Sequence, residues 1–219
     1  MLPMIVSAVA TATLLVATPA TTAVIDETEV GDFSDLWSSP SVLPLQPGST
    51  HVRGATGPGP GGAIDVDYFT AVVPDGEFLI NIFLNDYWQQ ALTVNQVPGR
   101  LGDRGAFLAL THGDESATEA DFQSKMSGAL LIGVMPEVDP GSDILAALAE
   151  VNDFVVPSFA LPLSEGAYTF WYQQNRVGAQ GATTYDFEFV VTPLPGALTL
   201  MGPAALGLAL WARRRSRAV

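Results

Sequence analysis

The sequence predicts an all-β domain, an antiparallel β-sandwich, placed between two apolar chain ends. Short runs rich in β-branched and aromatic residues recur along the chain, separated by Gly- and Pro-rich turns, and only one short stretch has helical spacing. In the run from Tyr185 to Val191, bulky apolar residues alternate with acidic ones. A period of two is that of a strand with one buried face, and several such strands with few helices are typical of β-sandwiches.

The first third of this body is predicted to be mostly irregular. Residues 24–35 are acidic and lead toward the first strand, and residues 43–48 have the Pro-Gly content of a turn in which Gly48 suits a positive φ. Residues 54–62 hold two prolines among their glycines. Because proline donates no backbone hydrogen bond, this stretch is predicted to be a loop outside the sheets.

A β-hairpin is predicted around the turn formed by Pro74, Asp75 and Gly76. Residues 65–73 precede the turn and residues 77–82 follow it, and both are rich in β-branched and aromatic side chains. Period-two spacing places one set of apolar side chains of the second strand on an inward face: Phe78, Ile80, Ile82 and Leu84.

Further strands are predicted at residues 106–110, 130–134, 168–173 and 185–191. One short helix is predicted at residues 142–151, with Ser142 or Asp143 as its N-cap. Its apolar stripe consists of Ile144, Leu145, Leu148 and Val151.

Residues 1–23 are predicted to be a signal peptide that forms an N-terminal signal helix. The segment has no acidic residue, an apolar centre, and the small residues Thr21 and Ala23 at the minus-three and minus-one positions of a cleavage site. Ala20 is a competing cleavage point. A buried core helix is the alternative, and the absence of an amphipathic stripe disfavours it.

Residues 193–219 are predicted to be a sorting signal. Pro193, Leu194 and Pro195 precede an apolar stretch at residues 197–212, which ends in a basic cluster of Arg213, Arg214, Arg215 and Arg217. As a helix the stretch spans about 24 Å, less than the ~30 Å of a hydrocarbon core, so a short, transient transmembrane helix fits better than a permanent anchor. The arginines favour the cytoplasmic side. A core helix followed by a solvated basic tail is the alternative, which the lack of a polar face disfavours.

This tail resembles the C-terminal signal of PEP-CTERM proteins of Gram-negative bacteria, in the variant that reads Val-Pro-Leu-Pro-Ala. Here Thr192 stands between Val191 and Pro193, and Gly196 precedes Ala197. The resemblance implies that an exosortase-type membrane protease recognises and removes the tail. It also implies export through the inner membrane to the cell surface or the extracellular matrix.

Between the two ends lies one body, residues 24–192, which is long enough for a single domain with a sizeable core. It carries all 23 acidic residues of the chain and only five of its nine basic ones. Such a field repels phosphate and anionic headgroups, so nucleic acid is a poor partner, and divalent cations or basic surfaces are favoured. Because the chain has no cysteine, disulfides and thiolate metal sites are excluded.

Several short pieces of the body resemble the bacterial pre-peptidase C-terminal domain. They are Gly31-Asp32-Phe33, Asp-Val-Asp-Tyr-Phe at residues 65–69, the Pro-Asp-Gly turn, Gly-Ala-Tyr-Thr-Phe-Trp at residues 166–171, and the closing aromatic strand. The resemblance covers most of residues 24–191. It implies a jelly-roll-like sandwich of a kind that usually accompanies secreted enzymes without being the catalytic part.

No catalytic residue and no cofactor are predicted. His51 and His112 lie in neither a His-Glu-x-x-His nor a Gly-x-Ser-x-Gly motif, and both are expected to be solvated loop residues. Asp65 and Asp67 are the candidate metal ligands, because they are expected on one side of a strand and Ca²⁺ prefers several oxygen ligands. The alternative is that they only cap the start of that strand.

Trp88 and Trp171 are candidate glycan contacts, because each lies beside a tyrosine and two glutamines. The alternative is that both rings belong to the core, where strand aromatics are mostly found. The sequence therefore favours a non-enzymatic, exported β-sandwich with a structural or adhesive role. A carbohydrate-binding module for extracellular polysaccharide, or an accessory domain of a secreted hydrolase system, is the rival interpretation.

Overall fold

The structure is a computed structural model that describes residues 21–57, 65–89, 106–113, 126–132, 138, 140–150, 159–174 and 183–193, with residues 88 and 89 described by their backbone alone. The predicted tail helix and residues 1–20 of the predicted signal helix lie outside these residues. Residues 21–23, predicted as the end of that helix, instead form the start of a strand, because they pair with residues 48–50. Within the described ranges, no helix has both the length and the apolar character needed to cross a membrane.

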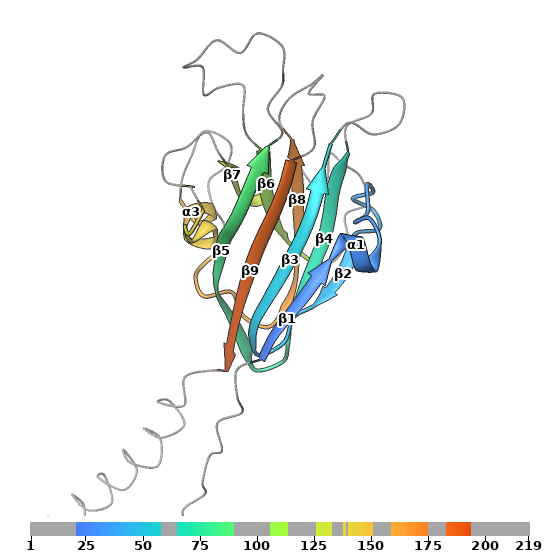
Figure 1. The fold of residues 1–219 in the computed structure, drawn as a ribbon. Coiled ribbons are helices and arrows are strands. Elements are labelled where there is room, and N and C mark those ends of the chain that lie inside the picture. The colour runs from blue at the N-terminus through green and yellow to red at the C-terminus, as the bar shows by residue number, and fades with distance from the viewer. Residues whose placement is uncertain are drawn as a thin grey trace, which may run out of the picture.

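The all-β prediction is confirmed, because the described residues form two sheets and only short helices (Figure 1). The first sheet has the order β1-β3-β9-β5, made of Thr21–Asp26, Gly48–Thr56, Thr183–Pro193 and Glu77–Gln89. The second sheet has the order β2-β4-β8-β6-β7, made of Ser41–Pro44, Val66–Val73, Gly166–Gln174, Ala106–His112 and Met126–Ile132.

Both sheets are mixed, so the prediction of a purely antiparallel sandwich was wrong at one edge of each sheet. β1 runs parallel to β3 and β2 runs parallel to β4, whereas the other five neighbouring pairs are antiparallel. Parallel neighbours need a crossover connection. Here the chain leaves β1 for β2 in the other sheet before it returns as β3, and it passes through β3 between β2 and β4.

The two sheets pack face to face around one core. The ring of Phe189 in β9 lies 6.4 Å from that of Phe69 and 5.5 Å from that of Phe170, both of which belong to the second sheet. The alternation predicted for the closing strand is confirmed, because Tyr185, Phe187, Phe189 and Val191 are all buried. Full burial of each such aromatic side chain contributes about 1.5–3 kcal/mol, which makes β9 a main source of stability.

The predicted inward face of β5 was wrong at its first half. Ile82 and Leu84 are buried as expected, but Ile80 is 36% exposed and its neighbour Leu79 is buried instead. The pairing of β5 with β9 shifts register between Leu79 and Asn81. A β-bulge adds one residue to a strand and so moves the preceding side chains to the opposite face, a shift that the period-two reading of the sequence does not reveal.

The first third of the chain holds more strand than predicted. Gly48 has a φ of 109°, as expected for its turn, but residues 24–26 of the predicted lead-in lie in β1, and residues 43 and 44 of the predicted turn lie in β2. Gly54 and the two residues after it, predicted as loop, belong to β3. The inward residues of β3 include Thr50, Gly54 and Thr56, which are too small or polar to give a bulky alternation, and this explains the error.

The remaining elements follow the prediction closely. β6 and β8 contain the predicted strands, and β7 begins four residues before its predicted start. The helix forms as α3, Ile144–Leu148, and Asp143 is its N-cap, with Oδ1 accepting from the backbone N–H groups of Leu145 and Ala146. Asp143 Oδ2 also accepts from Asn81 in β5 at 2.7 Å, which fastens this helix to the first sheet.

The two ends of the described chain leave the molecule at the same end of the first sheet. Thr21, the first residue of β1, pairs with Gly48, and Gly48 pairs on its other side with Val191 near the end of β9. Figure 1 shows β1 starting and β9 ending at one pole of the sandwich. β1 therefore runs away from this pole, toward the segment that carries the acidic residues Glu27 and Asp32.

Candidate functional site

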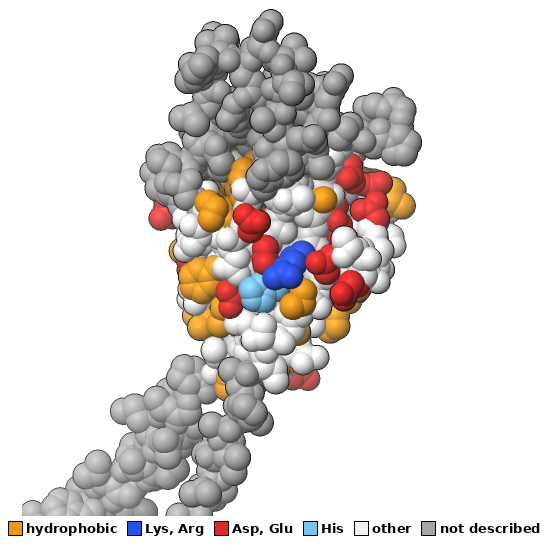
Figure 2. Space-filling model, in the orientation of Figure 1, with side chains coloured by type: hydrophobic (Ala, Val, Ile, Leu, Met, Phe, Trp, Pro, Cys, Tyr) orange, Lys and Arg blue, Asp and Glu red, His pale blue; other side chains and the backbone are white. Residues whose placement is uncertain are grey.

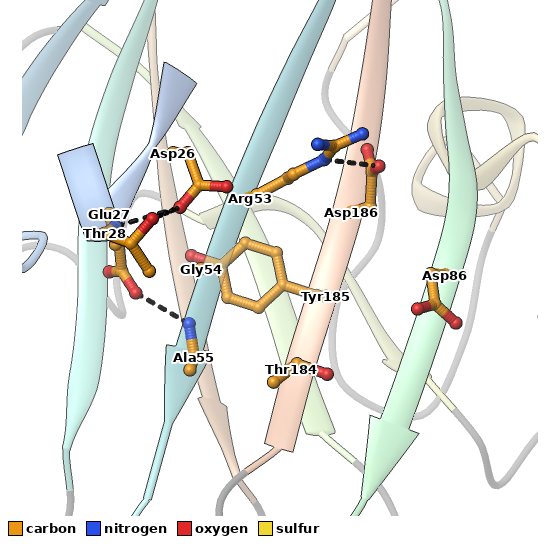
Figure 3. Close-up of a pocket in the computed structure, with 10 residues that line it drawn as sticks. All are labelled: Asp26, Glu27, Thr28, Arg53, Gly54, Ala55, Asp86, Thr184, Tyr185 and Asp186. Atoms are coloured by element: carbon orange, nitrogen blue, oxygen red, sulfur yellow. Dashed lines mark hydrogen bonds and ion pairs between the residues drawn. The ribbon is translucent and has the colours of Figure 1, made fainter. Parts of the chain in front are cut away.

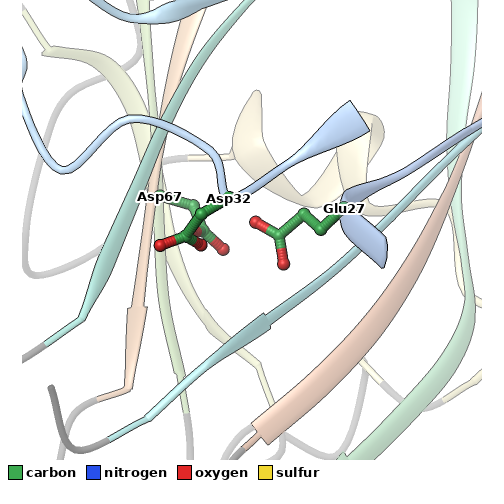
Figure 4. A group of neighbouring side chains, drawn as sticks. All are labelled: Glu27, Asp32 and Asp67. Atoms are coloured by element: carbon green, nitrogen blue, oxygen red, sulfur yellow. The ribbon is translucent and has the colours of Figure 1, made fainter. Parts of the chain in front are cut away.

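Three carboxylates meet at one edge of the sandwich, between the end of β1 in the first sheet and the start of β4 in the second. Glu27 is the first residue of α1 (Glu27–Val30), Asp32 follows that helix, and Asp67 is the second residue of β4. One carboxylate oxygen from each residue lies within 4.8 Å of the others (Figure 4). We call these three residues the acidic triad.

The local sequence holds Glu27 and Asp32 on either side of one tight turn. Asp26 caps α1 by accepting from the backbone N–H of Thr28 at 2.9 Å, and Gly31 ends the helix with a φ of 93° that favours glycine. Phe33 then enters the core, where its ring lies 5.7 Å from that of Phe69. Because the turn is fixed at both ends, the two carboxylates are directed toward β4.

Asp67 is the buried member of the triad, with a side chain that is 0% exposed. Its Oδ2 accepts a hydrogen bond from the hydroxyl of Tyr185 at 2.7 Å, whereas its Oδ1 has no hydrogen-bond partner among the described residues. Burial, and then the negative charge of Glu27, raises the pKa of Asp67 far above its usual range. A buried carboxylate oxygen without a hydrogen-bond partner is destabilising unless it binds a proton or a cation.

Glu27 is held by two backbone groups. Its Oε1 accepts from the N–H of Phe33 at 3.0 Å, and its Oε2 accepts from the N–H of Ala55 in β3 at 2.7 Å. These hydrogen bonds lower the pKa of Glu27, but burial outweighs them and the net shift is upward. Glu27 thus ties the α1 turn to the first sheet while its charge faces the other acids.

Asp65, one of the two predicted metal ligands, lies beside the triad. Its Oδ2 accepts from the N–H of Gly57 at 3.1 Å. Burial, followed by the charges of Asp32 and Asp35, raises its pKa to about 6. The structure therefore brings Asp67 into the acidic triad and leaves Asp65 next to it, before the first residue of β4.

The other two members of the acidic triad were missed by sequence reasoning. Asp32 belongs to Gly31-Asp32-Phe33, one of the short pieces that resemble the pre-peptidase C-terminal domain, and this resemblance was the one sequence signal that singled it out. Glu27 had none, because its proximity to Asp67 depends on the pairing of β1 with β3 and on the packing of the two sheets.

Positive charge is scarce around the acidic triad. Arg53 is the only Lys or Arg among the residues that the structure describes, and its Nε donates to Oδ2 of Asp186 at 2.9 Å. Figure 2 shows this face of the first sheet, where blue and pale blue side chains lie in the middle and red ones gather toward the edge that carries α1. The charges that affect the pKa of Asp67 most are those of other acids.

An open pocket of about 370 Å³ lies on the same face, next to the acidic triad (Figure 3). Glu27, a member of the acidic triad, lines this pocket, and so does Tyr185, whose hydroxyl donates to Asp67. Its other acidic lining residues are Asp26, Asp86 and Asp186. Their carboxylates leave the pocket predominantly negative, so it favours cations over anions.

Gly54 makes room for the hydrogen bond between Tyr185 and Asp67. A Cβ atom at this position would lie 2.6 Å from Cζ of Tyr185 and 3.0 Å from Cδ of Glu27. Side chains do not approach that closely, so any larger residue would displace the tyrosine ring. The glycine that was predicted to mark a loop therefore serves close packing inside a strand.

His51 and His112 lie in strands and not in the loops that were expected, although His112 is exposed to solvent as predicted and His51 is only partly buried. His51 lies in β3, where its Nδ1 is 2.9 Å from Oδ1 of Asp186, and His112 is the last residue of β6, with its ring against that of Tyr168. The hydroxyl of Ser49 donates to Glu188 at 2.7 Å. The serine next to His51 on this face is thus bonded to a carboxylate and not to the histidine.

Trp171 and Trp88 do not form a common surface that the structure describes. The Trp171 ring is 9% exposed, lies 5.0 Å from that of Phe107 and 5.9 Å from that of Tyr68, and donates its Nε1–H to Gln173. Trp88 is in β5, and its side chain lies outside the described residues. Glycan contact by either residue stays a prediction.

The residues assigned to processing are only partly described. Ala23 lies in β1 and pairs with Thr50, and Pro193 is the last residue of β9 and pairs with Glu77. The others lie outside the described residues: Leu194, Pro195, Arg213, Arg214 and Arg215.

Fold and site together define an acidic, β-sandwich-like all-β protein whose candidate site brings three carboxylates together. The chain matches no family model, and no curated protein and no solved structure is significantly similar to it.

Proposed function

We propose that this chain is an exported, non-enzymatic β-sandwich that acts as a structural or adhesive component of the cell surface or extracellular matrix of a Gram-negative bacterium. Its body is proposed to be jelly-roll-like, as in the pre-peptidase C-terminal domain. An exosortase-type membrane protease is proposed to remove the C-terminal tail, which holds the protein at the inner membrane before processing.

The observation that carries this proposal is the position of the two chain ends. Thr21 and Val191 lie on either side of Gly48 at one pole of the first sheet. A signal peptide that ends at Ala20, just before β1, or at Ala23, within its first three residues, and a membrane helix after β9 would therefore approach the membrane from the same pole. This arrangement supports a domain that stands on the membrane by that pole, with its acidic edge directed away from it.

The acidic character of the body supports the destination. Among the described residues, the carboxyl groups whose pKa is raised, first by burial and then by neighbouring negative charge, gather in and beside the acidic triad, and Arg53 is the only Lys or Arg. Such a surface resists binding to anionic headgroups and nucleic acid. It is suited to a protein that leaves the membrane once its tail has been removed.

Carbohydrate binding is the second candidate function, with extracellular polysaccharide as the ligand. It depends on Trp88 and Trp171, and the Trp171 ring is covered by Tyr68 and Phe107 on the outer face of the second sheet. Because a sugar stacks on a free ring face, the structural or adhesive role has the better support. A glycan array would reverse this order if it detected binding that Trp171→Ala abolishes.

Mass spectrometry of the protein from the surface and medium fractions of its host tests the proposal. The expected mature chain begins at Val24, or at Thr21 if Ala20 is the cleavage point, and lacks the apolar tail. Pro193→Ala combined with Pro195→Ala is expected to leave the tail in place, whereas Thr199→Ala within the apolar stretch serves as a control that is processed normally.

The proposal is overturned if the full chain to Val219 is found in the medium, or if residues 1–23 remain attached and the protein stays in the cytoplasm.

A further inference from the structure

We propose that Glu27, Asp32 and Asp67 bind one Ca²⁺ ion, which fastens the N-terminal segment of the body to the second sheet. The site would join the residue after β1, at the edge of the first sheet, to β4, which is next to the edge of the second. The ion would thus close the sandwich at the edge where its two parallel strand pairs lie.

The spacing of the three carboxylates fits a single ion. Ca²⁺ binds oxygen ligands at about 2.3–2.6 Å, so two ligands of one ion lie at most about 5 Å apart. The ligand oxygens of the acidic triad lie within 4.8 Å of one another. Figure 4 shows the carboxylates of Asp32 and Asp67 side by side, with that of Glu27 directed toward them.

A second, independent observation points to a ligand at this place. The Asp67 side chain is fully buried, and its Oδ1 has no hydrogen-bond partner in the described part of the chain. Its Oδ2 is oriented by the hydroxyl of Tyr185 at 2.7 Å. One carboxylate oxygen is thus held by a hydrogen bond and the other is unpaired. This is the arrangement expected of a metal-binding carboxylate, because ligating carboxylates are themselves held by hydrogen bonds.

The donor set selects the kind of ion. All three candidates are carboxylates, and the chain has no cysteine, so a hard cation is favoured over zinc or copper. The ligands come from two separate segments, and Glu27 is already held by two backbone N–H groups. Ca²⁺ accepts six to eight ligands in irregular geometry, whereas Mg²⁺ demands a near-ideal octahedron, and this favours Ca²⁺.

Titration of the calcium-stripped full chain with CaCl₂ in a mild detergent, followed by calorimetry, tests the proposal. We expect saturable binding of one ion, with a Kd on the order of 10⁻⁴–10⁻³ M as in extracellular calcium modules. MgCl₂ is expected to bind at least about tenfold more weakly.

Asp32→Asn is the sharpest variant. Asp32 is exposed, so the fold should tolerate the change, and the loss of one ligand charge is expected to weaken Ca²⁺ binding at least about tenfold. Glu29→Gln is the matched control, because Glu29 is exposed on α1, the short helix just before Asp32, lies outside the acidic triad and loses the same charge. Its Kd is expected to equal that of the parent chain.

Three results would overturn the proposal: no saturable binding up to about 10 mM Ca²⁺, an unchanged Kd in Asp32→Asn, or equal weakening in Glu29→Gln. Hydrogen exchange supplies a second readout. Ca²⁺ is expected to slow exchange of the backbone N–H groups of Gly31 and Phe33 selectively, and unchanged exchange there would contradict the proposed role in fastening the segment.

Discussion

The hydroxyl of Tyr185 donates a hydrogen bond of 2.7 Å to Oδ2 of Asp67 between the two sheets. Tyr185 belongs to β9 of the first sheet and Asp67 to β4 of the second, so this buried contact joins the two layers. It also orients the carboxylate that lies deepest in the acidic triad. Stability and ion binding are therefore coupled at this pair.

Tyr185→Phe is expected to lower the free energy of unfolding by about 1–3 kcal/mol, because it leaves Asp67 buried without its hydrogen-bond donor. Urea unfolding in the presence of a chelator would measure the change. Tyr172→Phe is the control: Tyr172 is equally buried, but its hydroxyl has no hydrogen-bond partner among the described residues. Removing that hydroxyl is expected to leave stability unchanged or slightly higher, and an equal loss in both variants would contradict this account.

The stability of the calcium-free protein is expected to fall as the pH rises from 5 to 8. The pKa values of Glu27, Asp65 and Asp67 are all raised in the folded state, mainly by burial, that of Asp65 to about 6. Unfolded carboxyl groups titrate near pH 4, so between these values the folded chain holds protons that the unfolded chain has lost. Raising the pH therefore favours unfolding.

Two other carboxyl groups do not alter this direction. The pKa values of Asp26 and Glu188 are lowered by hydrogen bonds, so both are ionised in the folded and unfolded states above about pH 5. Urea midpoints measured at several pH values with a chelator would test the slope. Saturating Ca²⁺ is expected to reduce it, and a midpoint that rises with pH in the chelator would contradict the prediction.

Gly54→Ala is expected to destabilise the protein by about 1–3 kcal/mol, because the added Cβ would overlap the ring of Tyr185 and approach Glu27. Thermal or urea unfolding measures this cost. In a Tyr185→Phe background the same substitution is expected to cost less, because the hydroxyl nearest to the new Cβ is gone. Strict additivity of the two changes would show that Gly54 is not required for the tyrosine.

Inserting about six Gly and Ser residues between Thr192 and Pro193 is expected to speed removal of the tail. Pro193, the first proline of the sorting motif, still pairs with Glu77 as the last residue of β9, so the motif begins at the surface of the folded domain. Pulse-chase labelling in the host would follow the processing. The same insertion between Asp75 and Gly76, in the turn at that pole, should leave the rate unchanged, and equal rates in all three chains would exclude steric control.

Local pattern was enough to predict the strands whose side chains alternate in size and polarity. Residues 185–191, 168–173 and 106–110 were predicted and lie in β9, β8 and β6. The Pro-Asp-Gly turn and the cap of α3 by Asp143 were also predicted, because each depends on a few neighbouring residues. β3 was missed because Gly54 and its threonines do not form a bulky alternation.

By itself, the sequence determined the all-β class, the acidic body and the absence of sulfur ligands, since these follow from composition and from spacing along the chain. The tertiary structure alone decided that β1 and β2 run parallel to their neighbours, and that Glu27 and Asp32 face Asp67. Glu27 and Asp67 are 40 positions apart: Glu27 begins the helix that follows β1 of the first sheet, and Asp67 lies in β4 of the second. Local periodicity fixes which way a side chain faces, whereas the approach of distant carboxylates requires that burial of the shared core first bring the two sheets together.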